Sequence, residues 1–348
     1  MWQVDNRTPF AVERTWVRDR DGAEVWLVAV KCTFDIKPDG STVIASEQPP
    51  VLRLPQFNGE PGKNSVRYDA DLVRTKTTTD VIVVGHAYAP PGRAVTELDV
   101  GFRVGPVQKV LRVFGDRIWA TSEPSSPEPF TRMPLVYERA FGGIDTQSAT
   151  PERDWEWRNP VGTGFAVARS HLTGRRLPNI EYPDELIRSR GDRPRPAGFG
   201  ALGSNWQPRA GFAGTYDDTW MRERQPLLPR DFDDRFFQCA PTDQQSPRFL
   251  TGGEPVVLNG LTPSGYLQSS LPQITLRFET RFYDRSREMH AGCNLHSVIL
   301  EPDYPRLSLV WHTALPCHFK VHKLERTLVT LQPQSVPTAA RATSADRN

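Results

Sequence analysis

The stretch EVWLVAVKCTFDI, residues 24–36, carries apolar side chains at every second position. These are Trp26, Val28, Val30, Cys32, Phe34 and Ile36. A period of two places them on one side of an extended chain, so the pattern predicts a β-strand. Lys31, Thr33 and Asp35 lie on the opposite face near the end, which predicts that the strand passes from fully buried to half exposed.

Similar patterns occur on the C-terminal side of this strand. ELDVGFRV (97–104) alternates apolar and polar residues, and DVIVVGHAY (80–88) is a short β-branched run. The last third contains QITLRFETRFYD (273–284), LHSVILEP (295–302), RLSLVWHT (306–313) and LERTLVTLQP (324–333). We therefore expect a mainly β protein with two β-sandwich or barrel-like lobes, one formed by residues 1–122 and one by residues 251–333.

Residues 123–250 are rich in proline, glycine, arginine and tryptophan, and no period of 2 or 3.6 persists there. Short helices are expected at 217–223 and 231–237, each opened by an aspartate in a capping position. So long a segment with little regular structure is ordered only if it packs on its own aromatic residues, which are abundant here. We expect an ordered loop region with short helices, and a disordered tail at 334–348.

Composition limits the class of protein. The 348 residues include 32 prolines, which disfavour helical bundles and doubly wound α/β folds. The formal net charge is +2, so no basic excess indicates nucleic-acid binding. The sequence shows no signal-peptide pattern and no apolar stretch of membrane-spanning length, and its four cysteines form no close pair. We expect a cytoplasmic protein that binds neither nucleic acid nor membranes.

Three motifs resemble known cofactor-binding or metal-binding patterns but lack the structural context that such sites require. GFGALG (198–203) matches a dinucleotide fingerprint, yet no buried strand precedes it, so a glycine-rich surface turn is expected. GEPGKNS (59–65) has the wrong spacing for a phosphate loop. On a strand, Cys317 and His318 would point to opposite faces, and His322 would lie too far from His318 for both to bind one ion. We expect no cofactor and no metal.

The acidic segment RDFDDRFF contains Asp231, Asp233 and Asp234. Such carboxylates could bind calcium or act as a paired general acid and base. The favoured interpretation is structural, because Asp231 and Asp234 occupy cap-like positions of a short helix beside Arg230 and Arg235. A hydrolase with its site here is nevertheless kept as an alternative function.

Arginine and aromatic residues recur together in the expected loop region. These residue types are enriched at protein-binding hot spots, although cation–π contacts and core packing account for part of the set. RNA binding would use the same types, but the interleaved acidic residues would repel phosphates. The candidate partner-binding residues are Tyr137, Arg139, Phe141, Trp155, Trp157, Arg158, Asn159, Trp206, Trp220 and Phe236.

Several segments follow one another from near residue 15 to about residue 315. They include VKCTF, KTTTDVIVVGHAYAP, VFGDRIW, PLVYERAFGG, RNPVGTGF, LPNIE, PAGFGAL, AGTYDDTWMRERQPLLPRDFDDRFFQCAPTDQ and GGEPVVLNGLTPSG. In this order they resemble the bacterial family known as domain of unknown function 2169 (DUF2169). The last thirty or so residues carry none of these motifs.

The resemblance implies a function in type VI secretion, because members of that family are encoded with type VI secretion clusters. It implies an adaptor or chaperone that holds a cognate effector, often one with a PAAR-repeat tip domain, and helps to load it on the spike. The family brings no catalytic residues, so no enzymatic activity is expected. A hydrolase and a purely structural component of the secretion machine stay open as alternatives.

Overall fold

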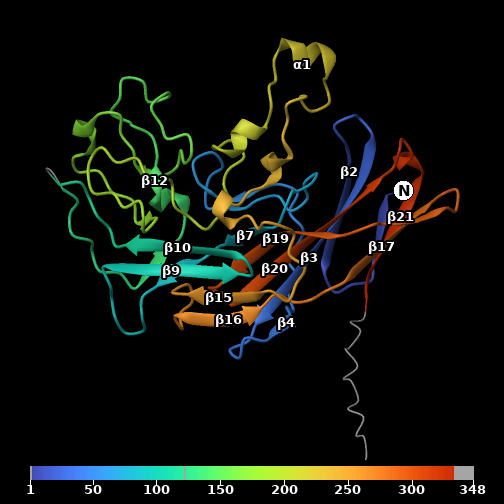
Figure 1. The fold of residues 1–348 in the computed structure, drawn as a ribbon, viewed down its shortest axis with the longest axis horizontal. Helices are drawn as coiled ribbons and strands as arrows, with labels where there is room; N and C mark the ends of the chain where they lie inside the picture. Colours follow the sequence, from blue (N-terminus) through green and yellow to red (C-terminus); the bar gives the residue numbers. More distant parts are fainter. Residues whose placement is uncertain (1, 121–122, 333–348) are drawn as a thin grey trace, which may run out of the picture.

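The computed structural model describes residues 2–120 and 123–332 (Figure 1). At its centre is a six-stranded sheet in the order β2-β3-β20-β19-β7, with β4 paired to the end of β3. Its strands are β2 (Ala11–Arg18), β3 (Glu24–Ile36), β4 (Thr42–Ile44), β7 (Asp80–Val83), β19 (Asn294–Glu301) and β20 (Arg306–Pro316). The strand predicted at 24–36 is therefore confirmed as β3, which lies between β2 and β20.

The second face of β3 differs in part from the prediction, because two of its three polar residues are buried too, while Asp35 is half-buried as expected. Lys31 and Thr33 lie among the buried residues of the strand. The Lys31 ammonium contacts the Asp71 carboxylate at 2.9 Å, and the Thr33 hydroxyl is 2.9 Å from the Ser308 hydroxyl. Each polar group finds a partner, so both faces of the strand can be covered.

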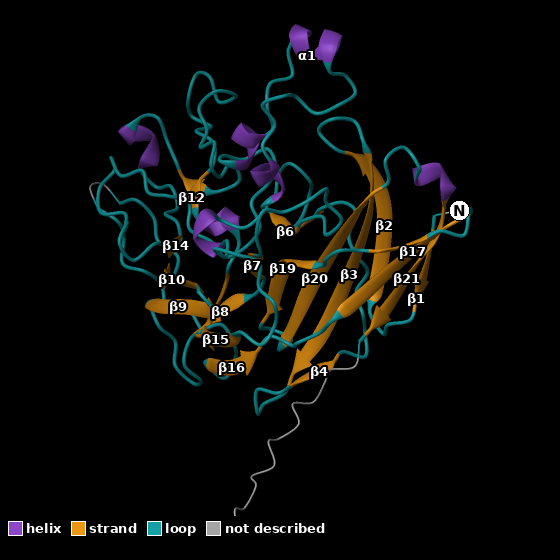
Figure 2. Cartoon of the chain, turned by 45° about the vertical axis from the view of Figure 1, so that its right-hand side comes forward, coloured by secondary structure: helices purple, strands orange, loops and turns teal. Residues whose placement is uncertain are grey.

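A four-stranded sheet packs on the central sheet as a second layer (Figure 2). Its order is β1-β21-β17-β18, with strands β1 (Gln3–Asn6), β17 (Leu276–Phe282), β18 (Arg287–Met289) and β21 (Leu324–Leu331). The Trp26 indole of β3 donates a hydrogen bond to the Thr327 hydroxyl of β21 at 2.9 Å, which joins the two layers. Phe278 and Phe282 pack from β17 into the shared core.

A five-stranded sheet extends the same hydrophobic core. Its order is β14-β10-β9-β15-β16, with strands β9 (Glu97–Val104), β10 (Val107–Phe114), β14 (Ile180–Glu181), β15 (Pro255–Asn259) and β16 (Tyr266–Ser270). Val100 and Phe102 of β9 point inward with Leu111 of β10. Within the described residues, no sheet closes into a barrel, so the sandwich form of the expected mainly β fold is the one observed.

The strand order differs from the expectation that each end of the chain builds a separate lobe. β3, from the first forty residues, pairs with β20 along its length, and β9 pairs with β15. Local sequence patterns predict strands but not their partners, which are chosen by the fit of buried faces. The tail predicted at 334–348 lies outside the described residues.

Residues 123–250, here called the loop layer, form an ordered region of short elements beside the sheets, as expected (Figure 1). Its 3₁₀ helices are η1 (Tyr137–Arg139), η2 (Arg169–Leu172), η3 (Arg209–Phe212), η4 (Asp234–Phe237) and η5 (Thr242–Gln244). Its α-helix is α1 (Asp218–Glu223), and its remaining strands are β11 (Arg132–Pro134), β12 (Phe141–Gly142) and β13 (Thr163–Gly164). Outside it lie β5 (Gln56–Phe57), β6 (Val66–Tyr68), β8 (His86–Tyr88) and η6 (Val321–Lys323).

The two helices expected in the loop layer have different outcomes. The first is confirmed as α1, and its cap is Asp217, whose side chain accepts a hydrogen bond from the Trp220 amide. The second is only the 3₁₀ helix η4, and its cap is Asp233, a position that the sequence analysis did not choose. No helix in the described residues is long and apolar enough to cross a membrane.

Candidate binding cavity in the loop layer

Asn159 holds the loop layer together from inside. Its side chain is completely buried and donates hydrogen bonds to the carbonyl oxygens of Tyr137 and Phe141. A Cβ atom at Gly142 or Gly162 would lie within 3 Å of this side chain, so both positions require glycine. Asn159, predicted to bind a partner, instead ties one part of the layer to another.

The Tyr137 ring is the buried centre around which a glycine-rich segment folds. The ring packs edge to face on Trp206, with centroids 5.5 Å apart, and its hydroxyl lies 3.3 Å from the Gly200 carbonyl oxygen. A Cβ atom at Gly198 would stand 2.7 Å from the ring. GFGALG is therefore a buried packing segment, and the surface turn expected there is wrong: its glycines make room for an aromatic ring.

A cavity of about 530 Å³ lies against Tyr137. Its apolar walls are Tyr137, Pro196, Leu202, Pro208 and Pro241. Its polar walls are Arg158, Tyr182, Arg195, Gln207, Thr242 and Asp243. Mostly apolar walls with a few fixed polar groups are typical of ligand and peptide sites.

Two arginines of the cavity are held rigidly by carboxylates. Arg158 makes a two-pronged ion pair with Glu156 at 2.7 and 2.8 Å. Arg195 pairs with Glu185 at 2.6 Å, and its guanidinium lies 4.3 Å from the centroid of the Tyr182 ring. Burial by itself raises the pKa of Glu156, but hydrogen bonds from Arg158 and the charge of its guanidinium outweigh it and hold that pKa below its ordinary value. The cavity therefore has fixed guanidinium groups rather than mobile ones.

Lys109 supports this wall from the five-stranded sheet below. Its ammonium donates to the Gly198 carbonyl oxygen at 2.8 Å, to Gln244 at 2.9 Å and to Asp243 at 3.0 Å. Burial lowers the pKa of Lys109 to about 8, although the nearby carboxylate of Asp243 opposes the shift. The side chain connects β10 with two segments of the loop layer.

Trp155 and Trp157 form a stacked pair beside the cavity, with ring centroids 4.2 Å apart. Trp157 is 57% exposed, and its carbonyl oxygen accepts a hydrogen bond from the amide of Gln207, a cavity residue. A large exposed aromatic side chain next to an apolar cavity is what a protein-binding surface presents. The cavity therefore gathers, directly or through contacts, Tyr137, Trp155, Trp157, Arg158, Asn159 and Trp206 from the predicted set.

The other predicted residues lie elsewhere. Arg139 binds Asp116 and Asn179 beside a separate cavity of about 390 Å³. Phe141 is buried in a small core cluster of its own. Trp220 belongs to α1 and donates to the Leu227 carbonyl oxygen, and Phe236 packs against Phe232 and Phe237.

The carboxylates considered for a hydrolase are each bound by a neighbour. Asp231 accepts hydrogen bonds from the amide and hydroxyl of Thr215, which lower its pKa. Asp233 pairs with Arg235, which also lowers its pKa. Asp234 pairs with Arg74. The capping role predicted for Asp231 and Asp234 is wrong, because longer-range partners take both side chains.

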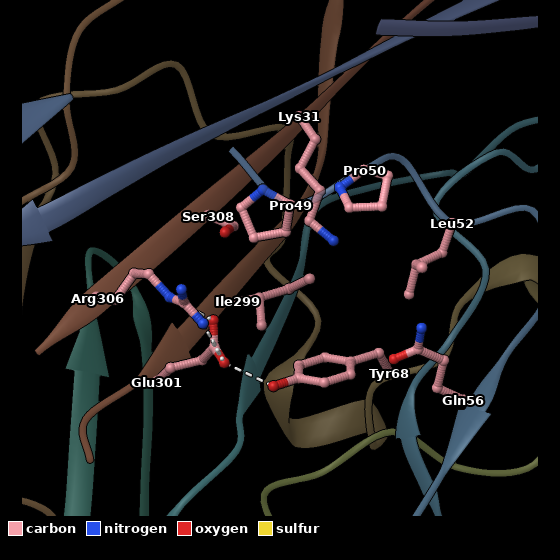
Figure 3. A pocket seen from close by; sticks show the side chains of 10 residues that line it. All are labelled: Lys31, Pro49, Pro50, Leu52, Gln56, Tyr68, Ile299, Glu301, Arg306 and Ser308. Carbon is pink, nitrogen blue, oxygen red and sulfur yellow. Dashed lines mark hydrogen bonds and ion pairs between the residues drawn. The ribbon is translucent and has the colours of Figure 1, made fainter. Parts of the chain in front are cut away.

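A small cavity of about 130 Å³ lies over the central sheet (Figure 3). The buried Glu301 carboxylate accepts a hydrogen bond from the Tyr68 hydroxyl at 2.6 Å and binds Arg306 through two nitrogens. Burial and this carboxylate raise the pKa of Tyr68 to about 12. These groups satisfy one another, so the loop-layer cavity is the stronger candidate site.

Sequence reasoning missed Tyr182, Arg195, Pro208, Pro241 and Asp243 of the cavity wall. Two of the family-like segments gave a signal, because LPNIE ends just before Tyr182 and CAPTDQ contains Asp243. The candidate residues were predicted where tryptophan and arginine lie close together in the sequence. This wall is instead assembled from separate segments.

One comparison identifies the family of the chain. The family described as "Uncharacterized protein conserved in bacteria (DUF2169)" matches residues 21–312, which is most of the chain. No curated protein and no solved structure matches it. The family motifs that the sequence displays in order include the segments around Tyr137, Asn159 and Gly198, which pack together beside the cavity. The chain therefore belongs to the DUF2169 family of bacterial proteins.

Proposed function

We propose that this protein is a cytoplasmic adaptor or chaperone of type VI secretion. It binds a cognate effector, or the PAAR-type tip domain of one, and promotes its loading on the spike. The support for the secretion pathway is the family resemblance. The support for a binding role is the loop-layer cavity with the exposed Trp157 beside it.

The cavity suits an apolar segment of a partner protein. Its proline, leucine and tyrosine walls would bury apolar side chains of the client, which is the main favourable term in association. The guanidinium groups of Arg158 and Arg195 stay fixed by Glu156 and Glu185, so little side-chain entropy is lost on binding. Such preorganised pockets supply most of the binding energy at interfaces.

The test is co-expression with an effector and a tip protein from the same secretion cluster. We expect a complex that stays together on size-exclusion chromatography at micromolar concentration. Separation of the purified components under those conditions would contradict a stable adaptor. A chain that assembles only with itself would favour the structural-component alternative.

Two variants locate the interface. Trp157→Ala removes the exposed ring, and Thr242→Trp fills the cavity from an exposed wall position. We expect each to weaken client binding by at least about tenfold, or 1.4 kcal/mol, with at most a small drop in melting temperature. Tyr266→Ala, which removes an equally exposed aromatic ring from β16, is the matched control and should bind normally.

Binding is favoured over hydrolysis by the state of the acidic cluster. A general acid needs a carboxyl group whose pKa is raised toward neutrality, and hydrogen bonds lower the pKa of Asp231 and Asp233 instead. Loss of client binding in Asp233→Asn without any change of fold would argue for a further contact there. Substrate turnover abolished by the same variant would overturn the proposal.

A further inference from the structure

Three arginines lie directly opposite one another across neighbouring strands of the four-stranded sheet. Arg326 of β21 faces Arg281 of β17, and Arg281 faces Arg287 of β18. Neighbouring strands are about 4.8 Å apart, so the row spans only about 10 Å. Like charges directly opposite one another destabilise a sheet, so this register carries a cost unless an anion offsets it.

The row lines a cavity of about 170 Å³ on the outer face of the sheet. The inner face of β17 is occupied by the buried residues Phe278, Thr280 and Phe282, so the alternating residues point outward. The cavity walls are Asp5, Arg7, Glu279, Arg281, Arg287, Arg326 and Leu328. None of these residues lines the loop-layer cavity, so this is a separate site, on β1, β17, β18 and β21 (Figure 2).

The charges in this cavity do not balance. Arg7 pairs with Asp5 at 3.2 Å, and Arg287 pairs with Glu279 at 3.3 Å. In the part of the chain that the structure describes, the side chains of Arg281 and Arg326 have neither a hydrogen bond nor an ion pair. Four guanidinium groups against two carboxylates leave a net charge of +2 in one concave site.

We propose that this cavity binds a phosphate group, either free phosphate or the phosphate of a small ester. A phosphate monoester carries about −1.5 to −2 charges at pH 7, which matches two unpaired guanidinium groups better than a single carboxylate does. The planar guanidinium fork also donates paired hydrogen bonds to such oxyanions. The inference is independent of the proposed adaptor function.

The first experiment is calorimetric titration of the full chain with inorganic phosphate at constant ionic strength. We expect one site whose affinity is several-fold lower at pH 6 than at pH 8, because phosphate loses its second charge as the pH falls. Carboxylates and guanidinium groups ordinarily titrate outside that range. Sulfate, which keeps both charges, serves as the control and should show no such pH dependence.

Matched variants decide whether the arginine row is the site. We expect Arg281→Gln and Arg326→Gln each to lower phosphate affinity by at least about tenfold. Arg277→Gln changes an arginine on the same strand and the same face but outside the cavity, and should bind phosphate like the wild type. Equal losses of phosphate affinity in all three variants would overturn the proposal. So would the absence of measurable phosphate binding by the wild type at about 10 mM, because a dissociation constant above that concentration is too weak for a specific site.

A second readout does not depend on binding heats. In phosphate-free buffer, Arg326→Gln should unfold at the same temperature as the wild type or higher, because it removes a like-charge contact with Arg281. Phosphate should raise the melting temperature of the wild type but not that of the variant. A variant that is less stable without phosphate would contradict the unbalanced charge on which the proposal rests.

The source of the phosphate group is distinguished by a parallel titration with glycerol phosphate. Tighter binding of the ester than of inorganic phosphate would identify an ester ligand, whereas binding of inorganic phosphate alone would identify the free ion. Either result supports a phosphate site. Chloride binding with comparable affinity would show unselective anion attraction and would overturn the proposal.

Discussion

At the scale of single residues, buried charges hold the loop layer to the sheets. Lys109 joins β10 to Gly198, Asp243 and Gln244, and Arg117 pairs with Glu181 of β14. Removing one partner of a buried pair leaves the other partner unsatisfied in a medium of low polarity. The loop layer should therefore be sensitive to the loss of one such side chain.

Lys109→Met should destabilise the protein by about 3 kcal/mol at pH 7, because three acceptors lose their donor. Burial lowers the pKa of Lys109 to about 8, so between about pH 8 and pH 10.5 the unfolded chain binds more protons at this residue than the folded chain. The stability that the lysine contributes should therefore grow as the pH rises through that window.

Urea unfolding of both proteins at pH 7, 8.5 and 10 measures this effect. The difference in free energy of unfolding between the wild type and Lys109→Met should grow as the pH rises. A difference that stays constant would mean that folding does not shift the pKa of Lys109, and one that narrows with pH would mean that folding raises it; either would contradict the lowered pKa. Lys63→Met, which removes an exposed lysine, is the control. Its free energy of unfolding should differ from that of the wild type by a small amount that is the same at each pH.

Buried histidines should make the fold sensitive to acid. Burial lowers the pKa of His290 and of His312 to about 4, and lowers that of His296 as well. The rings of His296 and His312 stack with centroids 4.4 Å apart, so charging one opposes charging the other. Because these groups are neutral in the folded chain and take up protons when it unfolds, stability should fall as the pH drops from about 6.5 toward 4.

The expected loss is on the order of 3 kcal/mol for a fully buried histidine with such a shift. Between pH 6.5 and 4.5, the free energy of unfolding of His312→Phe should decrease less than that of the wild type, even if the variant is less stable at neutral pH. His322→Gln changes an exposed histidine and should leave the pH dependence unchanged. Identical acid profiles for all three proteins would rule out a contribution from His312.

At the scale of elements, two tryptophans of the loop layer have opposite roles. Trp206 is 3% exposed and packs on Tyr137, whereas Trp157 is 57% exposed and stacks on Trp155. Trp206→Ala should cost about 3–5 kcal/mol of stability because it opens a cavity in a packed cluster. Trp157→Ala should cost at most about 1 kcal/mol, the value of an exposed aromatic pair.

Thermal unfolding of the two variants measures this difference. Equal losses would mean that Trp157 is packed as tightly as Trp206 and would remove it from the proposed interface. Arg158 is a poor choice for this comparison, because its ion pair with the buried Glu156 links binding to stability. Trp157 alone is therefore the variant of choice for client binding.

At the scale of the whole molecule, the two ends of the chain share their sheets. β3 lies between β2 and β20, and β9 lies between β10 and β15. Both sheets contribute to one large hydrophobic core. Neither of these two sheets is therefore complete within the first third or within the last third of the chain.

A fragment of residues 1–122 should fail to fold alone, because β3 would expose the edge that pairs with β20. We expect no cooperative thermal transition for this fragment by circular dichroism. The fragment 251–333 should behave in the same way, whereas residues 1–333 should unfold like the full chain. A cooperative transition in either short fragment would restore the two-lobe division expected from the sequence.

The sequence predicted well what depends on neighbours along the chain. The periodic segments at 24–36 and 97–104 are strands, and Asp217 caps α1 with a hydrogen bond that spans only three residues. The candidate binding residues differ in burial: Trp157 is exposed and Arg158 lines the cavity, whereas Phe141 and Asn159 are buried. Partner binding at any of them stays a prediction. Residue type alone does not separate a buried aromatic ring from an exposed one.

By itself, then, the sequence determined the β class, the short helix and the family, because alternation, capping and motif order are local properties of a chain. Only the tertiary structure decided that β3 pairs with β20, that GFGALG closes around Tyr137, and that Arg281 and Arg326 stand opposite one another, neither of them in an ion pair with another described residue. These features depend on the pairing and burial of residues that lie tens to hundreds of positions apart. Such contacts follow from the fit of whole surfaces, which no single stretch of sequence encodes.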